Sequence, residues 1–164
     1  MKARDPAWGA LIAGEAGVPS LLHVGAGPAA MAQRCRGILV YLATPYSREV
    51  LGPDGAWCPA RSIELGLRAA DRAARLARVG VTAVSPIAQA ADMVHVARPP
   101  IDPLDDAFWE AWCRPLLAGC GAVAVPDMPG WDRSRGIWHE VTWALERNMP
   151  VFVEASVSVE AGGP

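Results

Sequence analysis

The chain has 164 residues, of which 52% are hydrophobic and 20% are charged, and its formal net charge at pH 7 is −2. This length suits one domain that buries its own core, and the composition argues against extensive disorder. Without a basic stripe, the chain is not expected to bind a nucleic-acid polymer, although a single nucleotide stays a compatible ligand.

The cysteines and histidines give no sign of a metal or redox site. The four cysteines form no C-x-x-C pair, and the three histidines have no ligand spacing, so we expect reduced thiols, no metal and no cofactor. No apolar run approaches the ~20 residues that span a bilayer, and the first residues lack the apolar core of a signal peptide. We therefore expect a cytoplasmic protein that does not contact membranes.

In chain order, the first segment is an extension. Residues 1–36 are rich in Gly, Ala and Pro without a clear period, and a short strand is expected only near 21–24. The domain itself is expected over 37–154. The small and polar residues 155–164 are interpreted as a flexible tail.

The domain begins with an apolar run, 38–43, which predicts a buried strand that ends at Thr44-Pro45. The next helix places Ile63, Leu67 and three alanines on one face, which we expect to be the buried one. The elements predicted after the first strand are a loop over 48–60, a helix over 61–79, a strand over 81–84, a loop over 87–104, a helix from Asp105 or Asp106 to 118, a strand over 122–125, a helix over 134–148 and a strand over 150–154.

Strands that are nearly continuous apolar runs, alternating with helices, predict parallel strands covered on both faces. The expected fold is therefore α/β, a flavodoxin-like or Rossmann-like three-layer sandwich with a four- to five-stranded parallel sheet. Ligands bind such sheets at the carboxyl ends of the strands, near a switch in strand order. We expect the loops after Ala43, Val84 and Val125 to share one cleft.

The start of the last helix offers an anion or hydroxyl site. Free backbone N–H groups, the Ser134 hydroxyl, the Arg135 charge and the absence of a side chain at Gly136 suit a phosphate or a sugar hydroxyl. The alternative is that Ser134 only caps the helix and Arg135 lies in solvent.

Glu140 is the clearest candidate for chemistry. It shares a helix face with Gly136, Trp143 and Ala144, and a carboxylate buried there needs a partner. The sequence also permits the alternative in which Glu140 is exposed and Val141 is turned inward.

Three segments in this order resemble the nucleoside 2-deoxyribosyltransferase superfamily, whose relatives include N-glycosidases that hydrolyse nucleoside 5′-monophosphates. Tyr41-Leu42-Ala43-Thr44-Pro45-Tyr46-Ser47 is similar to that family's first strand and loop, and Ser134, Gly136 and Glu140 match its Ser-x-Gly-x-x-x-Glu helix. Ser85-Pro86-Ile87-Ala88 and Phe108-Trp109 resemble an uncharacterised branch. The resemblance covers about residues 37–154.

The resemblance implies that Glu140 attacks the anomeric carbon and forms a glycosyl-enzyme, after which water or a second base attacks. Tyr41 or Tyr46 would orient Glu140, while Ser134 and Gly136, with Arg135, would hold the 5′ substituent of the sugar. The remaining expected substrate-binding residues are Thr44, Pro45, Ser47, Ser85, Asp106 and Trp131. Trp109 or Trp131 would stack on the base, and the alternative for each of them is packing in the core.

The chain departs from the family at two positions, since Gly121 and Cys113 stand where many relatives have acidic residues. The proton donor to the departing base is therefore open, as is the choice between hydrolysis and transfer. The insertion 48–59 is a candidate lid. The alternative function is a non-catalytic nucleotide-binding or sensing module of the same fold. Trp138 and Trp143 suggest spare apolar surface, and so a homodimer or higher homo-oligomer.

Overall fold

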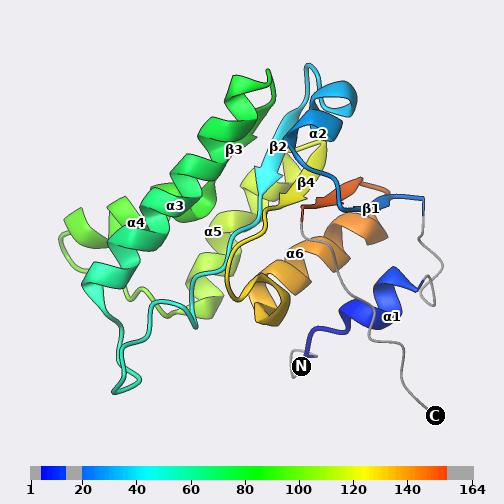
Figure 1. Cartoon of the computed structure of the whole chain (residues 1–164). Coiled ribbons are helices and arrows are strands. Elements are labelled where there is room, and N and C mark those ends of the chain that lie inside the picture. The colour runs from blue at the N-terminus through cyan, green and yellow to red at the C-terminus, as the bar shows by residue number, and fades with distance from the viewer. Residues whose placement is uncertain (1–4, 14–19, 155–164) are drawn as a thin grey trace, which may run out of the picture.

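The computed structural model describes residues 5–13 and 20–154 (Figure 1). A five-stranded, all-parallel sheet in the order β1-β5-β4-β2-β3 forms its centre, which confirms the expected α/β fold with a parallel sheet between helical layers. The strands are β1 (Leu22–Val24), β2 (Leu39–Leu42), β3 (Thr82–Val84), β4 (Ala122–Val125) and β5 (Val151–Val153).

The helices of the described residues connect these strands. Two of them begin at side-chain caps: Asp105 accepts a hydrogen bond from the Phe108 N–H at 3.0 Å, and Ser134 accepts one from the Ile137 N–H at 3.3 Å. The helices are α1 (Trp8–Ile12), α2 (Pro28–Arg34), α3 (Pro59–Arg78), α4 (Pro86–Val96), α5 (Asp106–Ala118) and α6 (Arg135–Glu146), with a short 3-10 turn over Trp131–Arg133.

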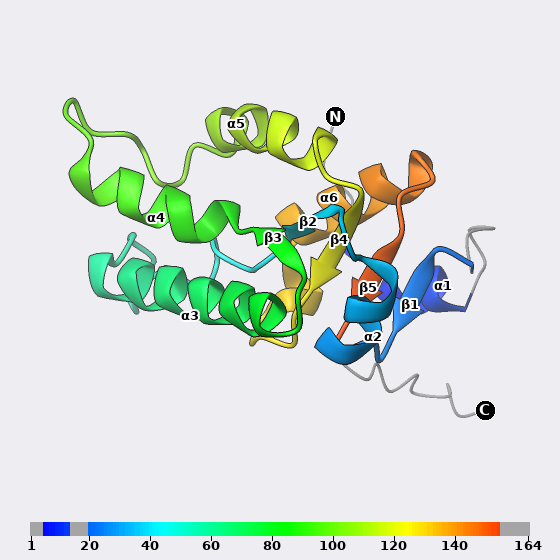
Figure 2. The same cartoon turned by 90° about the horizontal axis from the view of Figure 1, so that it is seen from above.

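The sheet separates two cores because successive side chains of a strand point to opposite faces. Tyr41 and Val123 point toward the layer that contains α1, α5 and α6. Val40, Leu42 and Phe152 point toward α2 and α3. Figure 2 shows α4 alongside α3, with α5 on the other side of α4, so α4 extends the structure beyond the edge strand β3.

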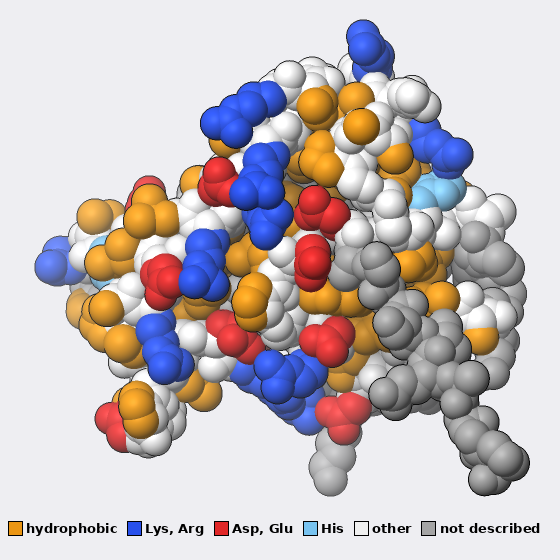
Figure 3. All heavy atoms as spheres, in the orientation of Figure 1, with side chains coloured by type: hydrophobic (Ala, Val, Ile, Leu, Met, Phe, Trp, Pro, Cys, Tyr) orange, Lys and Arg blue, Asp and Glu red, His pale blue; other side chains and the backbone are white. Residues whose placement is uncertain are grey.

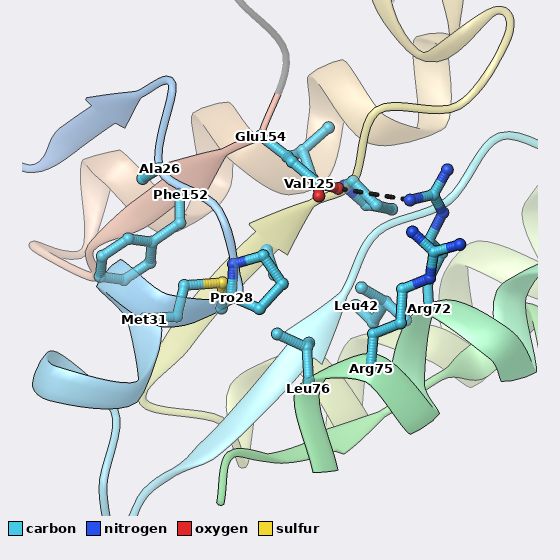
Figure 4. A pocket seen from close by; sticks show the side chains of 12 residues that line it. Ala26, Pro28, Met31, Leu42, Arg72, Arg75, Leu76, Val125, Phe152 and Glu154 are labelled. Carbon is cyan, nitrogen blue, oxygen red and sulfur yellow. Dashed lines mark ion pairs between the residues drawn. The ribbon is translucent and has the colours of Figure 1, made fainter. Parts of the chain in front are cut away.

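The layer of α2 and α3 closes tightly over its side of the sheet. The cavity drawn in Figure 4 is only about 20 Å³, the room of a single water molecule. Arg72 on α3 donates a hydrogen bond to the Asp127 carbonyl at 2.8 Å and forms an ion pair with Glu154 at 3.7 Å. These contacts tie α3 to the segments that follow β4 and β5, and the cavity beside them has no room for a larger ligand.

Three expectations differ from the structure. Residues 86–96 form α4 rather than part of a loop over 87–104. Within the expected extension 1–36, α1 and α2 are helical and β1 pairs with β5, so this segment contributes to the sheet. On α3 the expected buried face was wrong, since Ile63 and Leu67 are 51% and 68% exposed while Leu65 and Ala69 are buried.

Candidate functional site

The main cavity lies on the α5–α6 side of the sheet, where β2, β3 and β4 end. Its volume is about 430 Å³, within the range of small-molecule sites. The loop after β2, α4, α5, the segment after β4 and the start of α6 line it, so the loops after Ala43 and Val125 meet in one cleft, whereas the expected loop after Val84 is the first turn of α4, which contributes Ile87. The β3–β2–β4 arrangement is a switch in strand order, because the chain leaves β2 toward β3 and returns on the other side to β4.

Tyr41 and Glu140 meet at this cavity. The Tyr41 hydroxyl, fixed on the central strand β2 and 1% exposed, donates a hydrogen bond to Glu140 Oε1 at 2.5 Å. Glu140 lines the cavity from the second turn of α6 and is largely buried. The side chain is thus turned toward the sheet, as the first of the two sequence interpretations requires, and its partner is Tyr41.

Burial dominates the electrostatics of this pair. It raises the pKa of Glu140 from its ordinary 4.5 to about 7, and the Tyr41 hydrogen bond opposes this rise. Burial and the neighbouring carboxylate raise the pKa of Tyr41, so its hydroxyl stays a donor. Cys113 on α5 lines the cavity beside the pair, and burial raises its pKa to about 11, which keeps it a neutral thiol.

The beginning of α6 forms the polar end of the cavity. Ser134 and Gly136 line it, and the Ser134 hydroxyl also caps the helix. A side chain at Gly136 would find nothing closer than 3.8 Å, so the glycine leaves open space rather than avoiding a clash. Arg135 lines the cavity as well and forms an ion pair with Asp5 at 2.9 Å.

The loop after β2 contributes Thr44, Pro45, Tyr46 and Ser47 to the lining. Thr44 is 6% exposed, and its hydroxyl has no hydrogen-bond partner among the described residues. The Tyr46 hydroxyl is bound elsewhere, since it accepts from Trp57 Nε1 at 3.2 Å and lies 2.9 Å from the Ser62 hydroxyl. Of the two tyrosines considered for orienting Glu140, the structure therefore places Tyr41 against it.

Besides Tyr41, which stands behind Glu140, two predicted site residues lie outside the lining, whereas Asp106 lies within it. Trp131 packs edge-on against Trp8 at 4.8 Å between ring centroids in the core, the second of its two expected roles. The Ser85 hydroxyl is buried behind the cavity, without a hydrogen-bond partner in the described part of the chain. Asp106, in the first turn of α5, does line the cavity.

Sequence reasoning missed part of the apolar wall, namely Ala90 and Val94 of α4 and Trp143 of α6. Ile87 of α4 also lines the cavity, as does Trp109 of α5, which was expected either to stack on the base or to pack in the core. The α4 residues recur at spacings of three and four, a helical signal that was overlooked beside the prolines at 99, 100 and 103.

The insertion 48–59 is packed rather than loose. Val50 is fully buried with Leu65 and Met128, and a bridge joins Leu51 to Trp57. Only Arg48 and Glu49 of this insertion line the cavity.

Both tryptophans from which we expected self-association have partners within the chain. Trp138 packs on Trp8, and the Arg147 guanidinium lies 4.1 Å from the centre of the Trp143 ring. The homo-oligomer stays a prediction that no longer rests on these side chains.

Three general features of the described residues concern charge, metal binding and membrane crossing. In Figure 3 basic and acidic side chains alternate over the coloured part of the face. Among residues 5–13 and 20–154, no cluster of three His, Cys, Asp or Glu is arranged to hold a metal ion. None of the helices in that part of the chain has the length and apolarity to cross a membrane.

Comparison with known proteins identifies a family without a stated activity. Residues 38–156 match the family described as "Domain of unknown function (DUF1937)", which is well over half of the chain. No curated protein matches the sequence.

Proposed function

The chain belongs to this family, and we propose that it cleaves or transfers the N-glycosidic bond of a nucleoside or a nucleoside 5′-monophosphate, with Glu140 as the nucleophile. The observation that carries this proposal is the Tyr41–Glu140 hydrogen bond of 2.5 Å at a cavity of about 430 Å³. Burying a carboxylate lowers the stability of the fold, and a purely structural role does not explain why this carboxylate faces an open cavity.

The pair has the chemistry that a retaining reaction needs. Glu140 Oε2 carries no hydrogen bond from Tyr41, so it is the oxygen that would attack the anomeric carbon, while Tyr41 holds Oε1 and fixes the rotamer. The N-glycosidic bond breaks as the new C–O ester bond forms, and the bonding electrons leave with the base. Water or a second base then displaces Glu140, which gives hydrolysis or transfer.

The buried Thr44 hydroxyl supports the proposal that the ligand carries hydroxyl groups. A hydroxyl that is buried without a partner costs about 1–3 kcal/mol, and Thr44 borders the same cavity as Glu140. A ribose or deoxyribose hydroxyl would satisfy it. The apolar wall of Ile87, Val94 and Trp109 suits a flat base at the other end of the cavity.

The polar end favours a 5′-phosphate. Arg48 and Arg135 line the cavity on the side of Ser47 and of the α6 N-terminus, where backbone N–H groups and the helix dipole favour an anion. Phosphate binding would compete with Asp5 for Arg135.

Incubation with a panel of nucleosides and nucleoside 5′-monophosphates, with free base measured by chromatography, tests the proposal. We expect base release from a monophosphate that falls about 1,000-fold or more in Glu140→Gln, while ligand binding measured by calorimetry persists. Binding without base release by the wild-type protein would favour the sensing module. Faster cleavage of unphosphorylated nucleosides would contradict only the phosphate assignment.

A further inference from the structure

A second pair of titratable side chains borders the cavity beside Tyr41 and Glu140. His139 Nε2 of α6 lies 3.5 Å from Glu110 Oε1 of α5, and both residues line the cavity. The two side chains are about half exposed. The reaction steps proposed above assign no role to Glu110 or His139.

The helix positions explain why both side chains reach the cavity. On α6, His139 lies three residues after Gly136 and four before Trp143, both of which line the cavity, so it stands at the edge of the stripe that contains Glu140. On α5, Glu110 lies four residues after Asp106 and three before Cys113 on a similar stripe. The Glu110–His139 contact therefore spans the two helices at the cavity wall.

Glu110 has a second partner. Arg114, one turn further along α5, lies 2.7 Å from the same Glu110 oxygen and also lines the cavity. A carboxylate 3.5 Å from Nε2 orients the imidazole ring. His139 would then be a proton donor with a defined direction.

We propose that His139, positioned by Glu110, donates a proton to the departing base, an inference that rests on the proposed function. As the N-glycosidic bond breaks, its electron pair goes to the base, and the imidazolium gives that base a proton and becomes neutral imidazole. In the second step the imidazole removes a proton from the attacking water or acceptor. The ester to Glu140 then breaks, which regenerates the carboxylate and the imidazolium.

Cys113 is another proton donor that lines the cavity, but its position suits protonation of the departing base less well. Its thiol lies beside Tyr41 and Glu140, on the side of the nucleophile, and burial raises its pKa to about 11. A thiol is a weak hydrogen-bond donor. His139 instead stands at the edge of the cavity and is open to solvent, from which it can be reprotonated.

The test compares two leaving groups in His139→Gln and Glu110→Gln. One substrate is the best natural substrate from the panel, and the other is the 4-nitrophenyl glycoside of the same sugar, whose phenolate leaves without a proton. Because the second step is the same for both substrates, the readout is kcat/KM, which reports only the steps through departure of the leaving group. For the natural substrate we expect H139Q to lower kcat/KM about 100-fold. With the nitrophenyl glycoside, its kcat/KM should stay within about threefold of wild type.

The Glu110 variant should show the same pattern with a smaller loss, because it acts through His139. Glu64→Gln is the matched control, since Glu64 is paired with Arg68 four residues on, as Glu110 is with Arg114, but on α3 and outside the cavity. Thermal unfolding of each variant monitors its fold.

An unchanged kcat/KM of H139Q on the natural substrate would overturn the inference, as would an equal loss of kcat/KM on both substrates, and Glu140 would keep its role in either case. If the wild-type protein releases no base from any substrate, the proposed function fails and the inference falls with it.

Discussion

Replacing Glu140 with Gln should stabilise the protein at alkaline pH. The native state holds the Glu140 proton up to a pKa of about 7, whereas its ordinary pKa is 4.5, so between these values the native state binds more protons than the unfolded state. Stability contributed by the protonated side chain is therefore lost as the pH rises through this window. At about 1.4 kcal/mol for each pKa unit, the full cost is about 3 kcal/mol, and water in the cavity reduces it.

Urea unfolding of wild type and E140Q at pH 5 and pH 8.5 measures this cost. Between the two values, the wild-type free energy of unfolding should fall by about 2 kcal/mol relative to E140Q. E146Q is the matched control, since Glu146 is on the same helix with its side chain 74% exposed, and its difference from wild type should not change with pH. A wild type that gains stability relative to E140Q, or a difference that is equal at both pH values, would refute the assignment of a buried carboxylate.

Three further substitutions test the partner of Glu140, the packing of α3 on α4 and the polar end of the cavity. Tyr41→Phe removes the one interaction that lowers the pKa of Glu140, so that pKa should rise by about one to two units, measured by NMR titration of the ¹³C-labelled carboxyl group; an unchanged value would contradict the pairing. Gly66→Ala would bring its new Cβ to 2.9 Å from the Ala91 Cβ, so α3 and α4 must separate, and the free energy of unfolding should drop by about 1–3 kcal/mol in urea titration, partly recovered by Ala91→Gly. In Gly136→Val the new side chain has space within the fold but enters the polar end of the cavity. KM should therefore rise about tenfold, while the free energy of unfolding changes by about 1 kcal/mol or less. A large loss of stability would show that the role of Gly136 is structural.

The strands β2 and β4 could be predicted because all their residues except Leu39 are buried and need only be apolar. The run 38–43 contains β2, and 122–125 coincides with β4. The helix α4 was missed because it packs against α3 on one side and the cavity on another, which leaves it without a clear polar stripe. For α3, a stripe of Ile63, Leu67 and alanines suggested the wrong face, because a helix rich in alanine shows apolar spacing on more than one side.

The nucleophile candidate was predictable, but its surroundings were not. A carboxylate among Gly, Trp and Ala on one helix indicated that Glu140 turns inward, and the strand before Thr44 supplied Tyr41 as a candidate partner. The choice between Tyr41 and Tyr46 depended on which face of the sheet and which loop neighbour each tyrosine meets, and this is tertiary information. The Glu110–His139 contact joins residues of two helices and has no local signal in the sequence.

The most direct test of a nucleophilic Glu140 is to trap the intermediate with a 2-fluoro-sugar nucleoside, whose fluorine slows the second step. Peptide mass spectrometry should find one fluorinated sugar, attached to Glu140, and no label in E140Q. A label on another residue, or base release without any covalent adduct in the wild-type protein, would contradict the account.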